Sequence, residues 1–391
     1  RYPRLVVTAL LMPFMLAACE PAPQALVTLP PPDMANTTVP TLEPVTPGAA
    51  ADEPAEEASG LDENVNPLTG LPVSDPAVLE RRPLVIKVSN ESPEVRPQSG
   101  LSFADHVWEY QMEGWGQTRY TAIYLSQSPE RVGSVRSTRL IDVDVLVPMY
   151  GGLLVTSGAS SGVTTALKES GWWERVFREE PDGRHLVRIP DIPVAGTDFY
   201  HSLFAVPAQV WAYADRRRVN EPVDLSGLIF AAEPPAGGEP ASRLAMDYPG
   251  RGPVHRWVYD DASGRWLSST EDQRARAPEA IDIDLLTGEQ LAFDNVVILF
   301  AEHYLADFIE DQPNQLLSVG ILLHGEGDGF LLRDGRAYAI TWEREGDEMI
   351  RLLDTAGDPI PLRPGTTWFS TSVAPDAAEF SEFAATLDFT P

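Results

Sequence analysis

The sequence predicts an α+β fold, in which a mixed α and β N-terminal domain is followed by a mainly β C-terminal domain. Three observations predict it. The chain has 391 residues, more than the ~100–200 of a typical domain. Helical spacing of apolar residues is confined to the first half, and beyond the Pro/Gly-rich stretch 233–240 only short alternating runs remain. The apolar fraction, 43%, is ordinary for a folded protein.

Strands open the predicted N-terminal domain. Residues 84–88 alternate, so that Leu84, Ile86 and Val88 share one face. Two further alternating runs, 106–113 and 118–125, flank a four-residue connection at 114–117. This spacing predicts a β-hairpin.

Two helices are predicted after the hairpin. Apolar residues recur with helical spacing up to Tyr150, and Ser137 is a fair N-cap, so we expect a helix over 138–150. Residues 153–155 are typical of a buried strand, and the Ser/Gly-rich loop 157–162 leads to a second helix that starts near Val163.

Short alternating runs dominate beyond the Pro/Gly-rich stretch and predict a mainly β domain. The expected strands are residues 254–259, 265–267, 296–300, 329–332, 336–342 and 349–353. The two domains are therefore expected at 63–232 and 241–391.

Residues 1–19 predict a secretion signal that ends in a lipid attachment site. Arg1 and Arg4 supply a basic start, a mostly apolar run follows, and Leu16-Ala17-Ala18-Cys19 closes it. The apolar run is shorter than the ~20 residues that a membrane-spanning helix needs. The ending resembles the lipobox of bacterial lipoproteins, which implies diacylglycerol on the thiol of Cys19. The alternative is an ordinary signal peptide in which the cysteine stands by chance.

Residues 20–62 predict a disordered tether between the anchor and the folded body. Pro, Ala, Thr, Glu and Asp dominate them, without apolar periodicity. Such a segment cannot bury enough apolar surface to offset the entropy of ordering it.

Charge and cysteine content exclude several classes of function. Acidic residues number 58 against 29 basic ones, for a net charge of −29, which argues against a nucleic-acid binder. One cysteine excludes an internal disulfide and zinc sites built from cysteine pairs. The six histidines show no metal-ligand spacing, and the acidic turns at 260–261 and 282–284 lack EF-hand spacing. We expect neither a metal nor a cofactor.

An arginine cluster is the most informative local feature. Bases slightly outnumber acids between residues 81 and 140. Arg136 and Arg139 are three apart and can share one side of the first turn of the predicted helix, where unpaired N–H groups favour anions. Two interpretations stay open. Either Asp105, Glu109 or Glu113 neutralises the cluster internally, or an external anionic ligand does.

Two further residues could belong to this site. Arg119 follows the hairpin turn and Glu113 precedes it, so they can lie nearly opposite each other, as a structural salt bridge or as an orienting pair for a ligand. His201 stands beside aromatic residues and could point into the arginine site or be purely structural. The predicted ligand-binding set is Asp105, Glu109, Glu113, Arg119, Arg136, Ser137, Arg139 and His201.

A competing catalytic signal is the G-x-S-x-G pattern at 158–162, between a predicted strand and a helix. Asp191 or Asp198, with His201 or His255, could complete a triad around Ser160. The strand–helix alternation of an α/β-hydrolase fails beyond residue 240, however, and no Gly-rich oxyanion loop precedes the serine.

Several short motifs resemble one family. They are Arg96 to Leu101, Ala104-Asp105, Glu109, Glu113-Gly114, Thr118-Arg119, Gly133 to Arg139, residues 325–342 and Pro364 to Trp368. Their order and spacing resemble the YerB-like bacterial lipoproteins, over about residues 66–373. The resemblance implies a two-domain envelope lipoprotein and no reaction, because the family is a domain of unknown function. Tyr200-His201-Ser202 departs from the Pro-His-Asn step that the family tends to have.

The sequence therefore predicts an extracytoplasmic cell-envelope lipoprotein that the lipid on Cys19 anchors to the membrane. The expected function is a binding or scaffold role, in which an Arg-lined site holds an anionic envelope component or a protein partner. The alternative is an envelope hydrolase or transferase that acts on a phosphate- or carboxylate-bearing polymer through Ser160 or His201.

Overall fold

The computed structural model describes residues 64–390, apart from 91–92, 115, 190–198 and 376–383. The predicted signal peptide at 1–19, Cys19 itself and the predicted tether at 20–62 lie outside the described residues. So do Asp191 and Asp198.

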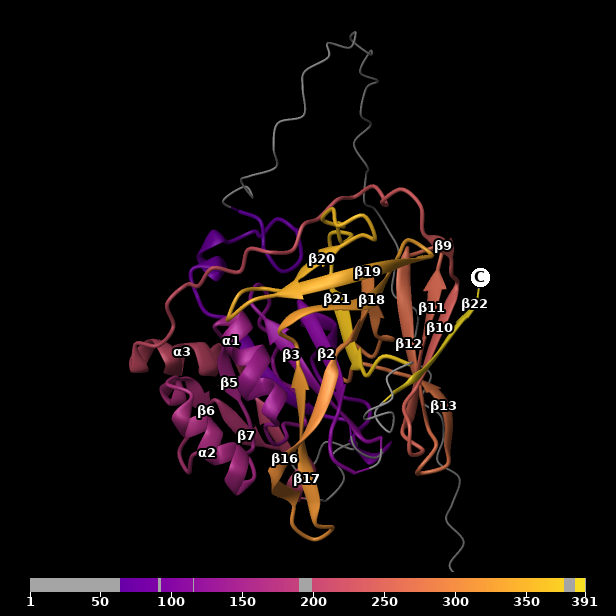
Figure 1. Cartoon of the computed structure of the whole chain (residues 1–391). Coiled ribbons are helices and arrows are strands. Elements are labelled where there is room, and N and C mark those ends of the chain that lie inside the picture. Colours follow the sequence, from indigo (N-terminus) through magenta and orange to yellow (C-terminus); the bar gives the residue numbers. More distant parts are fainter. Residues whose placement is uncertain (1–63, 91–92, 115, 190–198, 376–383, 391) are drawn as a thin grey trace, which may run out of the picture. The chain divides into compact units, whose positions relative to one another are not determined.

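One large sheet runs through the described body and takes strands from both halves of the chain (Figure 1). Its order is β20-β19-β18-β15-β21-β2-β3-β1-β5-β6, with β9 beside β19. The N-terminal half contributes β1 (Leu84–Ser89), β2 (His106–Gln111), β3 (Thr118–Tyr124), β5 (Leu153–Val155) and β6 (Val176–Phe177). The C-terminal half contributes β9 (Glu239–Pro240), β15 (Asn295–Phe300), β18 (Gly325–Arg333), β19 (Arg336–Arg344), β20 (Arg351–Leu353) and β21 (Thr367–Ser372).

Both faces of this sheet are buried, and the residue pattern explains why. Strand β1 is buried along its whole length. Leu84, Ile86 and Val88 pack into one core, whereas Val85 packs into a second core on the opposite face. Near-continuous apolar runs such as Leu84 to Val88 are typical of strands covered on both sides. The predicted shared face of the three residues is confirmed.

Helices cover the part of the sheet formed by the N-terminal half (Figure 1). They are the composite helix made of a π-helical stretch, Asp142–Leu146, and α1 (Val147–Tyr150), then α2 (Ser161–Glu169) and α3 (Pro207–Arg217). Short 3-10 turns lie at Pro76–Leu79, Pro93–Val95, Leu101–Phe103, Trp173–Arg175 and Phe199–His201. None of the helices in the described part of the chain has both the length and the apolarity needed to cross a bilayer.

Three smaller sheets complete the body. One follows the order β13-β12-β11-β10-β22 with β14 beside β12, one pairs β4, β8 and β7, and one holds only β16 and β17. Their strands are β4 (Val132–Gly133), β7 (Leu186–Arg188), β8 (Leu203–Ala205), β10 (Arg243–Asp247), β11 (Pro253–Asp260), β12 (Arg265–Asp272), β13 (Ala277–Ile281), β14 (Ala292–Phe293), β16 (Glu302–Asp311), β17 (Leu316–Leu322) and β22 (Thr386–Thr390). The α+β class is confirmed.

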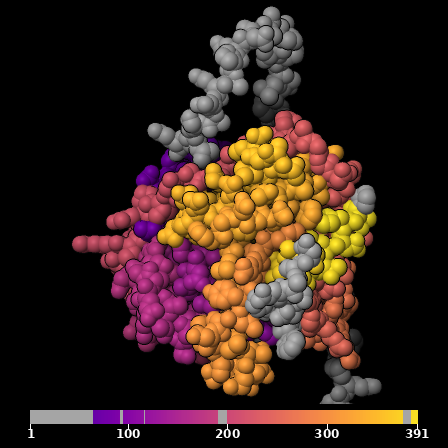
Figure 2. Space-filling model, in the orientation of Figure 1, coloured from indigo at the N-terminus to yellow at the C-terminus, as the bar shows by residue number. Residues whose placement is uncertain are grey.

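The β16–β17 hairpin, here called the arm, belongs to the C-terminal half but packs on the N-terminal half. Figure 2 shows its orange surface against the magenta surface of the earlier residues. The ring of Phe308 stands where a Cβ on Gly162 of α2 would be, and the Tyr304 hydroxyl donates a 3.3 Å hydrogen bond to Asp144. Docking on α2 gives this two-stranded sheet support that an isolated hairpin lacks.

The two halves of the chain, predicted as two domains, share the large sheet. Strands β2 and β21 pair in parallel, from His106 opposite Thr367 to Glu109 opposite Ser370, so the two halves share a continuous hydrogen-bonded ladder. Even the Pro/Gly-rich stretch at the expected boundary takes part, because β9 pairs with β19.

Candidate functional site

The predicted arginine site is buried and internally paired. The Arg139 guanidinium donates from Nε to Glu113 at 2.8 Å and from Nη2 to the other oxygen of the same carboxylate. Its Nη1 lies 3.4 Å from Glu310 of the arm, and all three side chains are at least 91% buried. Burial would lower the pKa of Arg139, but the two carboxylates outweigh it and raise the pKa. In the structure, acidic residues of the protein itself therefore neutralise Arg139.

The predicted start of the helix at Thr138, with Ser137 as its cap, is wrong. Residues 136–139 are not helical, and the helical backbone begins at Leu140. The Asp142 carboxylate reaches back and accepts a 2.7 Å hydrogen bond from the backbone N–H of Arg139, in the manner of a capping box. The N–H group that was expected to attract an external anion is therefore satisfied by an internal carboxylate.

Arg119, Arg136 and Ser137 lie around the same turn. The Arg119 side chain, 2% exposed, donates from Nη1 to the carbonyl oxygen of Ser137 at 3.2 Å. In the hairpin it stands opposite Tyr110, whereas Glu113 lies beyond the end of β2. The predicted near-opposite placement of Arg119 and Glu113 is therefore wrong by several positions. Arg136 is half-buried, and its carbonyl oxygen accepts from Ser157.

Glu109 joins the two halves of the chain in the core. Its carboxylate lies 2.7 Å from Nδ1 of His255, and Nε2 of that ring lies 2.7 Å from the Ser268 hydroxyl, which donates to Asp282. His255 and Glu109 are both fully buried. Because Glu109, His255 and Ser268 are fully buried, these side chains join the two halves and offer no surface to a ligand.

Asp105 lies at the other end of β2 from Glu113 and is likewise engaged. It accepts hydrogen bonds from the Asn66 amide at 2.7 Å, the Leu125 backbone at 2.5 Å and the Ser126 hydroxyl at 2.8 Å. Burial raises its pKa, against the opposing effect of these donors. Its role is to hold the turn that opens the body.

Ser160 is a helix cap and not a nucleophile elbow. Its hydroxyl accepts from the backbone N–H of Val163 at 3.3 Å and donates to Glu310 at 2.8 Å. The predicted triad partner His255 is enclosed with Glu109, and His201 ends the 3-10 turn before β8. The hydrolase constellation around Ser160 is therefore not assembled by the described residues.

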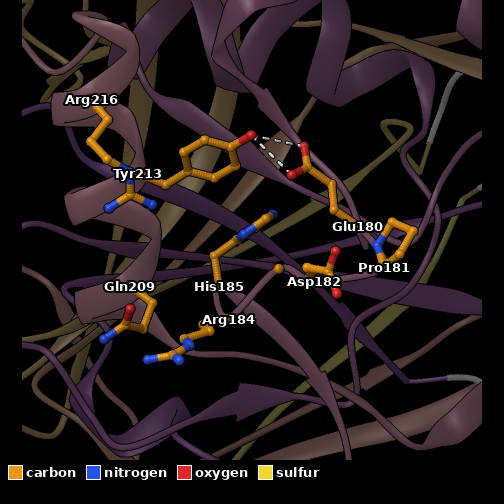
Figure 3. A pocket seen from close by; sticks show the side chains of 9 residues that line it. Glu180, Pro181, Asp182, Arg184, His185, Gln209, Tyr213 and Arg216 are labelled. Atoms are coloured by element: carbon orange, nitrogen blue, oxygen red, sulfur yellow. Dashed lines mark hydrogen bonds between the residues drawn. The ribbon is translucent and has the colours of Figure 1, made fainter.

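An open cleft of about 650 Å³ lies between α3 and the loop that joins β6 to β7, and we call it the α3 cleft (Figure 3). Its lining residues are Glu180, Pro181, Asp182, Gly183, Arg184, His185, Gln209, Tyr213 and Arg216. Its volume lies in the range of known ligand sites, ~300–1,000 Å³. Within the described residues it brings two exposed guanidinium groups to one opening.

The helical wall of the α3 cleft follows from the sequence of α3. Pro207 occupies the first turn, where its missing N–H costs nothing. Val210, Trp211 and Ala214 face the core. The residues spaced by four and three on another face are Gln209, Tyr213 and Arg216, and they line the cleft.

The opposite wall is a turn. Glu180-Pro181-Asp182-Gly183 is closed by a 3.0 Å hydrogen bond from the Gly183 N–H to the Glu180 carbonyl, as Pro-Asp-Gly favours. A Cβ at Gly183 would come within 2.9 Å of the His185 ring. The turn is thus shaped to seat that ring at the floor of the cleft.

Hydrogen bonds orient the floor of the α3 cleft. The Tyr213 hydroxyl donates to both oxygens of Glu180, at 2.9 and 3.1 Å, and Arg217 Nη2 lies 3.2 Å from the same carboxylate. Nε2 of His185 lies 2.8 Å from the carbonyl oxygen of Arg178, and burial lowers the pKa of this histidine. Arg184 and Arg216 remain exposed at the opening.

A second cleft of about 380 Å³ lies beside the arm. Leu305, Leu317 and Val319 of the arm face Pro249 and the hairpin turn at Gly114 across it. Its lining contains no arginine or lysine, so it lacks the cations that an anionic ligand would need.

Comparisons with known proteins identify the family. The N-terminal domain model of the proteins of unknown function DUF3048 matches residues 68–220, and the C-terminal domain model matches residues 244–369. The chain belongs to the DUF3048 family. The matched residues contain most strands of the large sheet and the whole α3 cleft.

A Bacillus subtilis (strain 168) relative, YerB, is provisionally named a lipoprotein. It is 29% identical over 320 residues, which cover 81% of this chain and 88% of YerB. A crystal structure of YerB from Bacillus subtilis superimposes with a TM-score of 0.65 at 26% identity, covering 83% of this chain and 99% of that one. The relationship therefore extends over both DUF3048 domains, in agreement with the YerB-like resemblance of the motifs.

Sequence reasoning missed the α3 cleft, although signals for it exist. Pro207 followed by Gln209, Tyr213 and Arg216 shows the start and the spacing of a helix. The Pro-Asp-Gly step marks the opposing turn. What no local pattern reveals is that the turn and the helix face each other.

Proposed function

We propose that this DUF3048 protein is a lipid-anchored, extracytoplasmic binding or scaffold lipoprotein of the cell envelope, and that it holds an anionic group in the α3 cleft. The buried arginine cluster is not carried into this proposal, because Glu113 and Glu310 already compensate Arg139. The observation that carries the proposal is the pair of exposed guanidinium groups, Arg184 and Arg216, in one open cleft.

Arginine suits this role because its planar fork matches a carboxylate or phosphate in two hydrogen bonds. Arg216 uses Nη1 for a 3.0 Å bond to the Ala212 carbonyl, which holds the side chain along α3 and leaves further N–H groups for a ligand. Gln209 adds an amide beside it. A scaffold role is favoured over catalysis because the buried acid and histidine groups described above are engaged by one another.

The proposed anchor is the diacylglycerol on Cys19. Its support is the Leu16-Ala17-Ala18-Cys19 ending together with the provisional lipoprotein name of YerB. Two acyl chains give stable membrane binding, whereas one gives only marginal binding. A Cys19→Ala variant should leave the membrane fraction and lack the lipid mass by mass spectrometry. Unchanged membrane retention would contradict the anchor.

Isothermal titration calorimetry of the whole detergent-solubilised protein tests the anion site. The ligand is N-acetyl-alanyl-alanine, whose only charge is a carboxylate. Hydrogen bonds to charged groups contribute ~1.5–3 kcal/mol each, so Arg184→Ala/Arg216→Ala should weaken binding at least tenfold. The control, Arg243→Ala/Arg351→Ala, removes the same charge at exposed positions elsewhere and should bind like the wild type. Equal binding by the two double variants would overturn the proposal.

A further inference from the structure

We propose that the α3 cleft recognises a zwitterion, namely a free amino acid or a short peptide that carries an ammonium group as well as a carboxylate. The inference rests on the proposed function and adds an ammonium-binding side to the same site. It starts from the arrangement of charges: arginines and carboxylates line the same opening on different elements (Figure 3).

The cationic side of the cleft comes from α3 and the residue that follows the turn. Figure 3 shows Gln209 and Arg216 on the helix, with Arg184 below them. Arg216 belongs to the last turn of α3, where a cation also complements the negative end of the helix dipole. The donors that line this side of the cleft are therefore two guanidinium groups and an amide.

The accepting side of the cleft comes from the turn. Glu180 and Asp182 place two carboxylates across from the helix (Figure 3). Glu180 is held by the Tyr213 hydroxyl and by Arg217, so its position is set before any ligand arrives. Asp182 is exposed at the tip of the turn.

His185 adds no positive charge to that side. A carbonyl oxygen can only accept, so Nε2 must carry the proton that bonds to the Arg178 carbonyl. Burial lowers the pKa of His185, which keeps the ring neutral near pH 7. An ammonium group has three N–H donors and no acceptor, which matches the carboxylates of the turn.

A ligand with one charge fits the cleft less well than one with both. A simple anion would be attracted by Arg184 and Arg216 but repelled by Asp182, because Glu180 is already paired with Arg217. A simple cation would be attracted by Asp182 and repelled by the two arginines. A dipeptide satisfies both sides, and a cleft of about 650 Å³ has room for it.

The test compares three ligands by isothermal titration of the whole protein. They are alanyl-alanine, with both charges, N-acetyl-alanyl-alanine, with the carboxylate only, and alanyl-alanine amide, with the ammonium only. Alanyl-alanine should bind at least tenfold more tightly than either of the others. Asp182→Asn should remove that advantage while binding of N-acetyl-alanyl-alanine stays the same or improves.

A matched control is Asp261→Asn, which removes one exposed carboxylate from a turn outside the cleft and should keep the tenfold advantage. If alanyl-alanine binds no more tightly than its acetylated form, and that form still requires Arg184 and Arg216, the zwitterion inference is wrong and the anion site stands. If N-acetyl-alanyl-alanine fails to bind or does not need the arginines, the proposed function itself is wrong. Loss of the advantage in Asp261→Asn would also overturn the inference.

Discussion

Arg139 illustrates how a charged residue that looks available in the sequence becomes structural. Its guanidinium is enclosed by Glu113 from the hairpin and Glu310 from the arm. A buried ion pair is weak support for stability as a whole, but removing one partner leaves an uncompensated charge in the core. The cost of breaking the pair should therefore be much larger than that of an exposed pair.

Arg139→Ala should lower the free energy of unfolding by about 3–5 kcal/mol, because Glu113 and Glu310 lose their partner. Urea unfolding monitored by tryptophan fluorescence measures it. Arg351→Ala is the control, since the side chains of its pair with Glu343 are 57% and 35% exposed, and a cost of about 0–1 kcal/mol is expected. Similar costs for the two variants would contradict the description of the buried cluster.

Lys87 gives the same region a pH dependence. Burial lowers its pKa to about 7, despite the Asp142 carboxylate 2.9 Å away. The folded pKa lies below the ordinary value of 10.5, so between those values the unfolded chain binds more protons. Stability should therefore rise with pH from about 7 to about 10, and Lys87→Gln should lose that slope in urea unfolding. If the stability of Lys87→Gln depends on pH in the same way as that of the wild type, the lowered pKa of Lys87 is contradicted.

At the residue scale, part of the site could be predicted from the sequence. The sequence predicts an internal carboxylate as one of two partners for the arginine cluster, and Glu113 is one of the candidate acids. Glu310 could not be found, because nothing local in its strand indicates which part of the molecule the arm meets. The Asp142 cap was missed because Ser137 is the more usual capping residue and stands where a helix start is plausible.

At the scale of elements, the arm depends on its contact with α2. Gly162 lies within that helix, and a Cβ there would come within 2.1 Å of the Phe308 ring. In an ordinary helix position Gly→Ala stabilises by roughly 0.5–1 kcal/mol. At Gly162 the Phe308 ring would have to move. Whether Gly162→Ala raises or lowers the free energy of unfolding therefore depends on how tightly the arm is packed.

Gly162→Ala should loosen the arm and increase hydrogen exchange of the β16 and β17 amides, while the amides of β1 stay protected. Thr165→Ala is the matched control on an exposed face of α2, and it should leave exchange in the arm unchanged. Unaltered protection of the arm in Gly162→Ala would show that the docking of Phe308 is not needed.

Regular elements of the first half followed closely from periodicity, whereas the arm did not. The hairpin, β5 and α2 were predicted within a few residues because their apolar spacing is clean. Polar and apolar residues alternate along the two strands of the arm. This pattern predicts only that one face of the hairpin is buried. Which element covers that face is decided by tertiary packing.

At the scale of the whole molecule, the continuous sheet joins the two DUF3048 domains, and we expect them to unfold together. Trp368 on β21 is fully buried, with its ring 5.0 Å from Tyr120 of the N-terminal half and 6.0 Å from Trp257 of the C-terminal half. Neither half can bury these surfaces without the other. The sequence suggested a boundary at 233–240 because Pro and Gly crowd there, but composition does not reveal which strands pair afterwards.

Trp368→Ala should destabilise both halves together, by about 3–5 kcal/mol as for other large-to-small core changes. Hydrogen exchange of β1 and β18 amides should accelerate in parallel, and calorimetry of the wild type should show one transition with equal calorimetric and van't Hoff enthalpies. Two separated transitions, or exchange that changes in only one half, would contradict a shared core.

The central claim concerns which arginines meet an anion, and arginine side-chain NMR measures this directly. The Nε–Hε signals of the whole protein would be followed during titration with N-acetyl-alanyl-alanine, after assignment by single substitutions. We expect the Arg184 and Arg216 signals to shift in a saturable way and those of Arg119 and Arg139 to stay in place. Saturable shifts at Arg119 and Arg139, with Arg184 and Arg216 unaffected, would contradict the account.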